Sequence, residues 1–106
     1  MEWTLVCPLD DIVPDTGVCA LLGNEQVAVF RVGVDAVFAI GNVDPHSRAA
    51  VLSRGLVGSI GERIVVASPL YKQHFDLQSG ACIESGAHSV ACYRARVMDG
   101  QVWISR

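Results

Sequence analysis

Short apolar runs, separated by turn residues about every 8 to 12 positions, most limit what this chain can fold into. Valine is the commonest residue, and its branched Cβ favours strands over helices. No stretch keeps an apolar period of 3.6 residues, so long helices are not expected. Asp99-Gly100 lies between the last two runs and is a strong signal for a type I′ hairpin. The sequence therefore predicts an all-β domain of short antiparallel strands.

The same pattern places the expected strands, turns and loops. Strands are predicted over 2–7, 19–22, 26–32, 34–40, 63–67, 74–77, 88–93, 96–98 and 102–104. Single helical turns are predicted over 8–12 and 47–52, and a hairpin is predicted at Gly23-Asn24-Glu25. Residues 41–55 and the segment that begins at Ser68-Pro69 contain turn formers, so we expect two irregular loops separated by a hairpin.

Length and charge limit the classes of protein to consider. A chain of 106 residues is long enough for one domain and too short for two, so residues 1–106 are expected to form a single domain. The net charge of −3 and the scattered basic residues argue against nucleic acid as a partner. No apolar run approaches the roughly 20 residues that span a bilayer, and the acidic start of the chain does not resemble a signal peptide. A cytoplasmic protein without membrane contact is expected.

The four cysteines, Cys7, Cys19, Cys82 and Cys92, form no metal or disulfide pattern. No Cys-x-x-Cys pair is present, which argues against a zinc site of the usual kind. A disulfide framework would need an oxidising compartment. Because free cysteine often behaves as a small hydrophobic residue, we expect these thiols to be buried.

The two predicted loops carry a specific resemblance. One contains Asp44-Pro45-His46 followed by Leu52-Ser53-Arg54-Gly55, and the other runs from Ser68-Pro69 through Phe75-Asp76-Leu77 to Gly80. They resemble the cluster-binding loops of Rieske ferredoxins, which read Cys-Pro-His before a Leu-Ser-x-Gly turn and Cys-Pro-x-His-Gly before Phe-Asp-Leu. The likeness extends over nearly the whole chain. It implies a Rieske-like antiparallel β-sandwich or barrel with two irregular loops in place of the cluster-binding loops.

The residues at the ligand positions do not match a cluster. A Rieske [2Fe–2S] centre needs two thiolates on one iron and two imidazoles on the other. Aligned on the prolines, the four positions hold Asp44, His46, Ser68 and Tyr71. Three ligands are therefore missing, and Lys72 replaces the glycine that lets the second loop fold tightly. The resemblance implies a domain that has lost its [2Fe–2S] cluster.

A Rieske-like domain of this length without cluster ligands resembles one family in particular, the small subunits of assimilatory NAD(P)H nitrite reductases. The match is carried by Pro45, Leu52-Ser53-Arg54-Gly55, Ala67-Ser68-Pro69-Leu70, Lys72-Gln73, Phe75, Ala95-Arg96-Val97 and Asp99-Gly100. It implies a large catalytic subunit as partner, which carries FAD, an iron–sulfur cluster and sirohaem and reduces nitrite to ammonium. No catalytic triad or nucleotide-binding glycine loop is apparent, so this chain is expected to be an inactive accessory subunit without cofactor, metal or catalytic residues.

Basic side chains in and near the two loops are the predicted docking residues. The predicted docking residues are Arg48, Arg54, Lys72 and His74. Three of them, together with Arg63, are expected to form a basic edge for an acidic partner or a cofactor phosphate. Dispersed charges of this kind are equally typical of a solvated rim. Arg54 is also expected to tie the two loops together through hydrogen bonds to carbonyl groups, in place of the missing metal.

Other residues allow a second interpretation. Asp44, His46 and His74 could form a two-histidine, one-carboxylate iron site, although loop residues of this kind more often cap turns. Two further functions also stay open, a Rieske-type ferredoxin that carries electrons to an oxygenase and a cluster-free interaction module with an unrelated partner.

The sequence also suggests positions for three ring side chains on predicted strands. Trp3 and Trp103, on the first and last strands, are expected to pair across the sheet, and an exposed tryptophan would instead mark an interface. His88 is expected to begin a strand at a sheet edge, without a partner.

Overall fold

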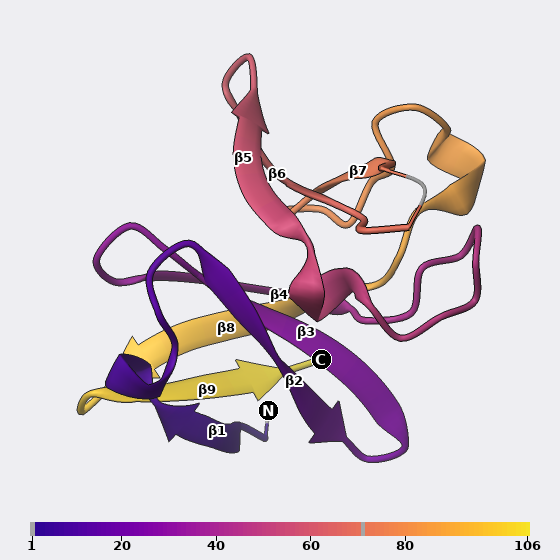
Figure 1. The fold of residues 1–106 in the computed structure, drawn as a ribbon. Helices are drawn as coiled ribbons and strands as arrows, with labels where there is room; N and C mark the ends of the chain where they lie inside the picture. The colour runs from indigo at the N-terminus through magenta and orange to yellow at the C-terminus, as the bar shows by residue number, and fades with distance from the viewer. Residues whose placement is uncertain (1, 71) are drawn as a thin grey trace.

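The computed structural model describes residues 2–70 and 72–106, and it confirms an all-β fold (Figure 1). In these residues the chain forms nine strands and three short 3₁₀ turns. The strands are β1 (Thr4–Pro8), β2 (Thr16–Leu22), β3 (Glu25–Val32), β4 (Ala36–Gly41), β5 (Leu56–Ile60), β6 (Arg63–Ala67), β7 (His74–Asp76), β8 (Cys92–Met98) and β9 (Gln101–Ser105). The turns are η1 (Leu9–Asp11), η2 (Leu52–Arg54) and η3 (Gly86–His88). No helix in this part of the chain is long and apolar enough to cross a membrane.

The strands form two antiparallel sheets. Six strands make the larger sheet in the order β1-β9-β8-β4-β3-β2, and β5-β6-β7 make the smaller one. The chain leaves the larger sheet after β4 and returns to it at β8, so the smaller sheet and both predicted loops form one inserted unit. Figure 1 shows this unit standing above the larger sheet.

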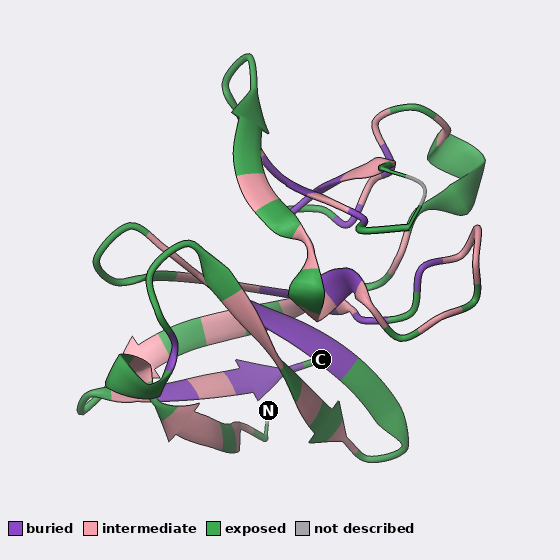
Figure 2. Cartoon of the chain, viewed as in Figure 1, coloured by how far each residue is buried: buried purple, intermediate pink, exposed green. Residues whose placement is uncertain are grey.

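Strand β3 is the common wall of two hydrophobic cores. Its residues Val27, Ala28, Val29 and Phe30 are all fully buried, which gives the continuous purple stretch in Figure 2. Because side chains alternate along a strand, Val27 and Val29 point into one core while Ala28 and Phe30 point into the other. The first core receives side chains from all six strands of the larger sheet, so this sheet curves around it as a barrel.

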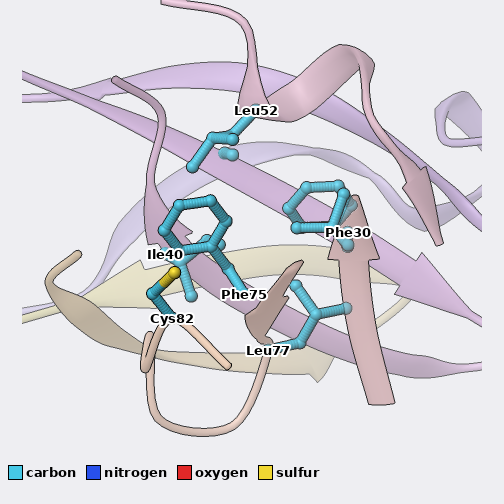
Figure 3. Close-up of a cluster of buried hydrophobic side chains, with 8 residues drawn as sticks. Phe30, Ile40, Leu52, Phe75, Leu77 and Cys82 are labelled. Carbon is cyan, nitrogen blue, oxygen red and sulfur yellow. The ribbon is translucent and has the colours of Figure 1, made fainter. Parts of the chain in front are cut away.

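The second core holds the inserted unit against the larger sheet. In Figure 3, Phe30 and Ile40 of the larger sheet meet Leu52, Phe75, Leu77 and Cys82 of the insertion. Each large apolar side chain buried in this way contributes roughly 1.5–3 kcal/mol. This core therefore fixes where the two loops begin and end.

The predicted turns are confirmed where the turn residues were specific. Asp99 and Gly100 have φ of 56° and 74°, as a type I′ turn between β8 and β9 requires. Gly23 has a φ of 63° in the turn between β2 and β3, and η1 forms within the predicted helical turn. The β5–β6 hairpin separates the two irregular loops.

Several predicted elements are wrong in place or extent. The strand predicted over 88–93 is absent, because His88 lies in η3 and the strand begins at Cys92. Two strands, separated at residues 94 and 95, were predicted in this region. The structure has the single strand β8, whose exposed and half-buried side chains alternate along its whole length. The helical turn predicted over 47–52 forms instead as η2. Strand β5 was not predicted, because Ser59-Ile60-Gly61 was expected to form a turn.

The predictions for the cysteines and tryptophans hold in part. Cys82 is buried and Cys7 is half-buried, but Cys19 and Cys92 are exposed, because their alternate positions face away from the barrel core. Strands β1 and β9 are neighbours, as expected. The ring of Trp3, however, is covered by the guanidinium of Arg96, whose Cζ lies 4.1 Å from the ring centroid, rather than by Trp103.

Candidate interaction site at the two loops

Loop 1 (residues 42–51) and loop 2 (residues 68–73) share one backbone plan. In loop 1 the Asp44 carbonyl accepts a hydrogen bond from the Arg48 N–H at 2.7 Å, and in loop 2 the Ser68 carbonyl accepts one from the Lys72 N–H at 3.0 Å. Arg48 and Lys72 both adopt left-handed backbone conformations, with φ of 63° and 57°. Such a conformation costs a residue with a Cβ roughly 1–2 kcal/mol. The expectation that Lys72 occupies a glycine-like position is therefore confirmed.

Asp44 and Ser68, which stand at the two cysteine positions, bond directly to each other. The Ser68 hydroxyl donates to Asp44 Oδ2, and both residues are almost completely buried. Asp44 Oδ1 accepts the N–H of His46 at 2.8 Å, and His46 Nδ1 lies 3.3 Å from the same oxygen. Burial alone would raise the pKa of Asp44, but the hydrogen bonds from Ser68 and from its own turn outweigh burial and hold the pKa below its usual range.

The hydrogen bond between Ser68 and Asp44 links the two loops, a role that the sequence analysis predicted for Arg54. In the described residues the Arg54 guanidinium has no hydrogen bond, so the prediction that it ties the loops together is wrong. The reason is geometric, because the 44 and 68 side chains converge between the loops while Arg54 is exposed at the end of η2.

A third segment (residues 81–91) contacts both loops, and its side chains pair with His46 of loop 1 and His74 of β7. The rings of His46 and His88 lie 4.5 Å apart, and His88 Nδ1 is 3.0 Å from the Ser85 hydroxyl. His74 Nδ1 lies 2.6 Å from Glu84 Oε2. The expectation that His88 has no partner is therefore wrong, and no motif in residues 81–91 indicated these contacts.

The donor set does not fit a [2Fe–2S] cluster. Oxygen atoms occupy both thiolate positions and are already bonded to each other, and oxygen is a poor substitute for sulfur in such clusters. None of the four cysteines lies in either loop, and the predicted ligand position Tyr71 lies outside the described residues. Over residues 2–70 and 72–106, no group of three or more His, Cys, Asp or Glu side chains could hold a metal ion. His74, paired with Glu84, does not join Asp44 and His46 in an iron site.

A groove of about 360 Å³ lies beside loop 2 and brings three of the four predicted docking residues together. Its floor is a row of neighbours across the smaller sheet, in which the small Ala67 lies between Leu56 and His74. The lining residues are Arg54, Leu56, Ala67, Ser68, Pro69, Lys72 and His74. The fourth predicted residue, Arg48, is not among them.

The groove carries uncompensated positive charge. Neither Arg54 nor Lys72 has a hydrogen-bond or ion-pair partner within the described part of the chain, and no acidic side chain lines the groove. Arg63, by contrast, is paired with Asp76, whose Oδ2 lies 2.6 Å from Arg63 Nε. The arrangement suits an apolar group that ends in a carboxylate or another anion.

The two sheets and the paired loops define a Rieske-like domain, and residues 2–105 match the family described as Rieske-like [2Fe-2S] domain. The chain is 54% identical over 102 residues to the nitrite reductase (NADH) small subunit of Escherichia coli K12. The matched residues make up 95% of this chain and 94% of that protein. The solved structure of the E. coli protein NirD superposes with a TM-score of 0.90 at 53% identity, covering 97% of this chain and 94% of that one. The chain belongs to the family of nitrite reductase small subunits.

A third relative places a similar domain inside a larger protein. The nitrite reductase [NAD(P)H] large subunit of Klebsiella oxytoca contains a stretch 43% identical to this chain over 102 residues. That stretch covers 96% of this chain and only 11% of the large subunit.

Proposed function

We propose that this chain is a cytoplasmic accessory subunit that docks onto the large catalytic chain of an NAD(P)H nitrite reductase, without taking part in electron transfer. The observation that carries the proposal is the Asp44–Ser68 hydrogen bond, which fills the positions where a Rieske domain holds its cluster. Six-electron reduction of nitrite to ammonium needs redox cofactors, and FAD, an iron–sulfur cluster and sirohaem would belong to the large chain. The large subunit of Klebsiella oxytoca, which contains a similar domain, supports this choice of partner.

The same proposal assigns docking to the groove. Arg54 and Lys72 are unpaired cations beside exposed apolar surface, and Leu56 is 77% exposed. A charged rim around an apolar centre is a usual composition for an interface between proteins. Co-purification tests the pairing: the tagged chain should retain the large nitrite reductase chain of the same organism. Its absence at several salt concentrations would contradict the proposal.

The purified chain should be colourless. Because oxygen atoms occupy both thiolate positions, we expect far less than one iron per chain and no visible absorption band after anaerobic purification. Metal analysis and an absorption spectrum of the same sample check this. Stoichiometric iron with an iron–sulfur spectrum would show that the chain carries electrons.

Charge reversal in the groove should weaken docking. The double variant Arg54→Glu, Lys72→Glu is expected to raise the Kd for the large chain about 10- to 100-fold, because two unpaired cations become anions at the contact. Arg48→Glu is the matched control, since Arg48 does not line the groove and its change should alter the Kd less than about threefold. Calorimetric titration at fixed ionic strength measures both. Equal losses for the double variant and the control would remove the groove from the interface.

A further inference from the structure

Strand β5 is the outer strand of the smaller sheet, and its outer edge is open. Strand β1 has a bulge between Leu5 and Cys7, ends at Pro8 and faces the end of β2 across a shared pocket. Strand β2 is also approached by η2. The outer edge of β7 is covered by residues 81–83, which hydrogen-bond to His74 and Asp76. Beyond its ladder with β6, β5 makes no recorded backbone hydrogen bond.

The register shows which backbone groups of β5 are free. A two-residue turn joins β5 to β6, so Ile60 and Arg63 form its closing, hydrogen-bonded pair. Because hydrogen-bonded pairs alternate along an antiparallel ladder, Gly58 and Leu56 also direct their N–H and C=O groups toward β6. Val57 and Ser59 must then direct theirs to the open edge. Consistent with this alternation, the carbonyl of Ile64, opposite Ser59, accepts the Leu77 N–H on the far side of β6.

The side chains of β5 do nothing to block another strand. Natural proteins protect open edges with charged residues, proline or bulges, and the sequence Leu-Val-Gly-Ser-Ile contains none of these. Leu56 and Ile60 are 77% and 40% exposed, and the space next to the Cα of Gly58 is open. In Figure 1 this hairpin projects away from both cores, so a second chain can reach it.

We propose that an extended segment of the large catalytic chain adds to β5 as a further strand, bonded to the N–H and C=O groups of Val57 and Ser59. The inference rests on the proposed function and supplies its docking mode. The groove is continuous with this edge, because Leu56 belongs to both and Arg54 lies just before it. Arg54 and Lys72, which have no ion-pair partner among residues 2–70 and 72–106, favour an acidic residue at the end of the segment that reaches the groove. Main-chain bonds then supply affinity, and the groove supplies specificity.

Amide hydrogen exchange, measured residue by residue, tests the strand addition. In the free chain the Val57 and Ser59 amides should exchange quickly, while Gly58 and Ile60, bonded to β6, should be protected. Adding the large nitrite reductase chain should slow Val57 and Ser59 at least about tenfold, since new main-chain bonds cover them. Gly58 and Ile60 serve as controls within the same strand, and their protection should not depend on the large chain.

A pair of variants supports the measurement. Ser59→Pro removes the outward N–H and leaves the β6 ladder intact, so it should weaken binding of the large chain at least about tenfold. Ser59→Ala keeps the N–H and should bind like the unmodified chain. Thermal unfolding of both variants checks that each is folded. If Ser59→Pro does not fold, the exchange measurement on the unmodified chain still tests the inference.

The other outcomes separate this inference from the proposed function. If the large chain binds but Val57 and Ser59 remain unprotected, strand addition is wrong and docking stands. Protection that appears in the small chain alone, and grows with its concentration, would make a second copy the occupant and overturn the inference. If no complex forms at all, the proposed function fails and the inference fails with it.

Discussion

Replacing Asp44 with alanine should lower the free energy of unfolding by about 3 to 5 kcal/mol, because several buried donors lose their shared acceptor. The carboxylate accepts the Ser68 hydroxyl and the His46 N–H, and it is completely buried. Hydrogen bonds to a charged group are worth about 1.5–3 kcal/mol each, and a buried donor without a partner costs about 1–3 kcal/mol. Urea unfolding at pH 7 measures the loss, which is a large share of the stability of a domain this size.

A double-mutant cycle assigns part of that loss to the bond between the loops. Ser68→Ala alone should cost about 1–2 kcal/mol, and the double variant should cost about 1–2 kcal/mol less than the sum of the single changes. The coupling appears because each single change already breaks the same bond. Additive losses would mean that Asp44 and Ser68 do not hold the two loops together in solution.

The same carboxylate gives a pH dependence with a definite sign. The pKa of Asp44 lies below its ordinary value of 3.8, so near and below that pH the unfolded chain takes up the proton first. The contribution of Asp44 is therefore complete above about pH 5 and is lost as the pH falls through its folded-state pKa. Asp44→Asn lacks this titration, so the stability gap between the two proteins should narrow below about pH 4.

Much of the fold could be predicted because its strands follow the local signals of β structure. β3 and β6 were placed within one residue, since both are unbroken apolar runs bounded by turn residues. β5 was missed because it is an exposed edge whose last two residues were assigned, with Gly61, to a turn, and only pairing with β6 makes it a strand. His88 was predicted to begin a strand, but it ends the 3₁₀ turn η3, where its ring lies against that of His46 in loop 1.

The candidate site could be predicted from ligand chemistry but not from geometry. The residues at positions 44 and 68 indicated that the donor set does not fit a [2Fe–2S] cluster, because neither is a thiolate. The hydrogen bond between the two side chains depends on their convergence from loop positions 24 residues apart, which no local pattern encodes. Likewise, Arg54, Lys72 and His74 line one groove only because strand pairing sets Leu56, Ala67 and His74 side by side, a register that no local pattern encodes.

The hydrogen bond between the two loops also explains why the strained loop backbones persist. Arg48 and Lys72 keep left-handed conformations although both carry side chains. The Asp44–Ser68 bond and the core beneath Leu52 and Phe75 determine where the loops run, so the strain is held by contacts elsewhere. The loops thus keep their shape through contacts within the protein, and Lys72 lines the groove beside loop 2.

Gly55 is the position where a single methyl group should have the largest steric effect near the groove. A Cβ added there would lie 2.3 Å from the Ala67 carbonyl oxygen and 2.6 Å from Val66 Cγ2. The backbone of Gly55, with φ of −73° and ψ of 172°, is open to any residue, so the close approach of β6 is the cause. Gly55→Ala should therefore cost about 2–3 kcal/mol and lower the Tm by about 10 °C or more.

Gly58→Ala is the matched control, because it makes the same chemical change three residues later in open space. Both substitutions reduce the freedom of the unfolded chain equally, so their difference isolates the steric cost. Gly58→Ala should leave the free energy of unfolding within about 0.5 kcal/mol of the unmodified value or raise it slightly.

Gly55→Ala should also push β6 away from η2. This shift deforms the groove between Arg54 and Ala67 and weakens binding of the large chain. Calorimetric Tm and Kd values measured on both variants decide the matter, and equal Tm values would show that the contact between Gly55 and β6 is looser than the structure has it.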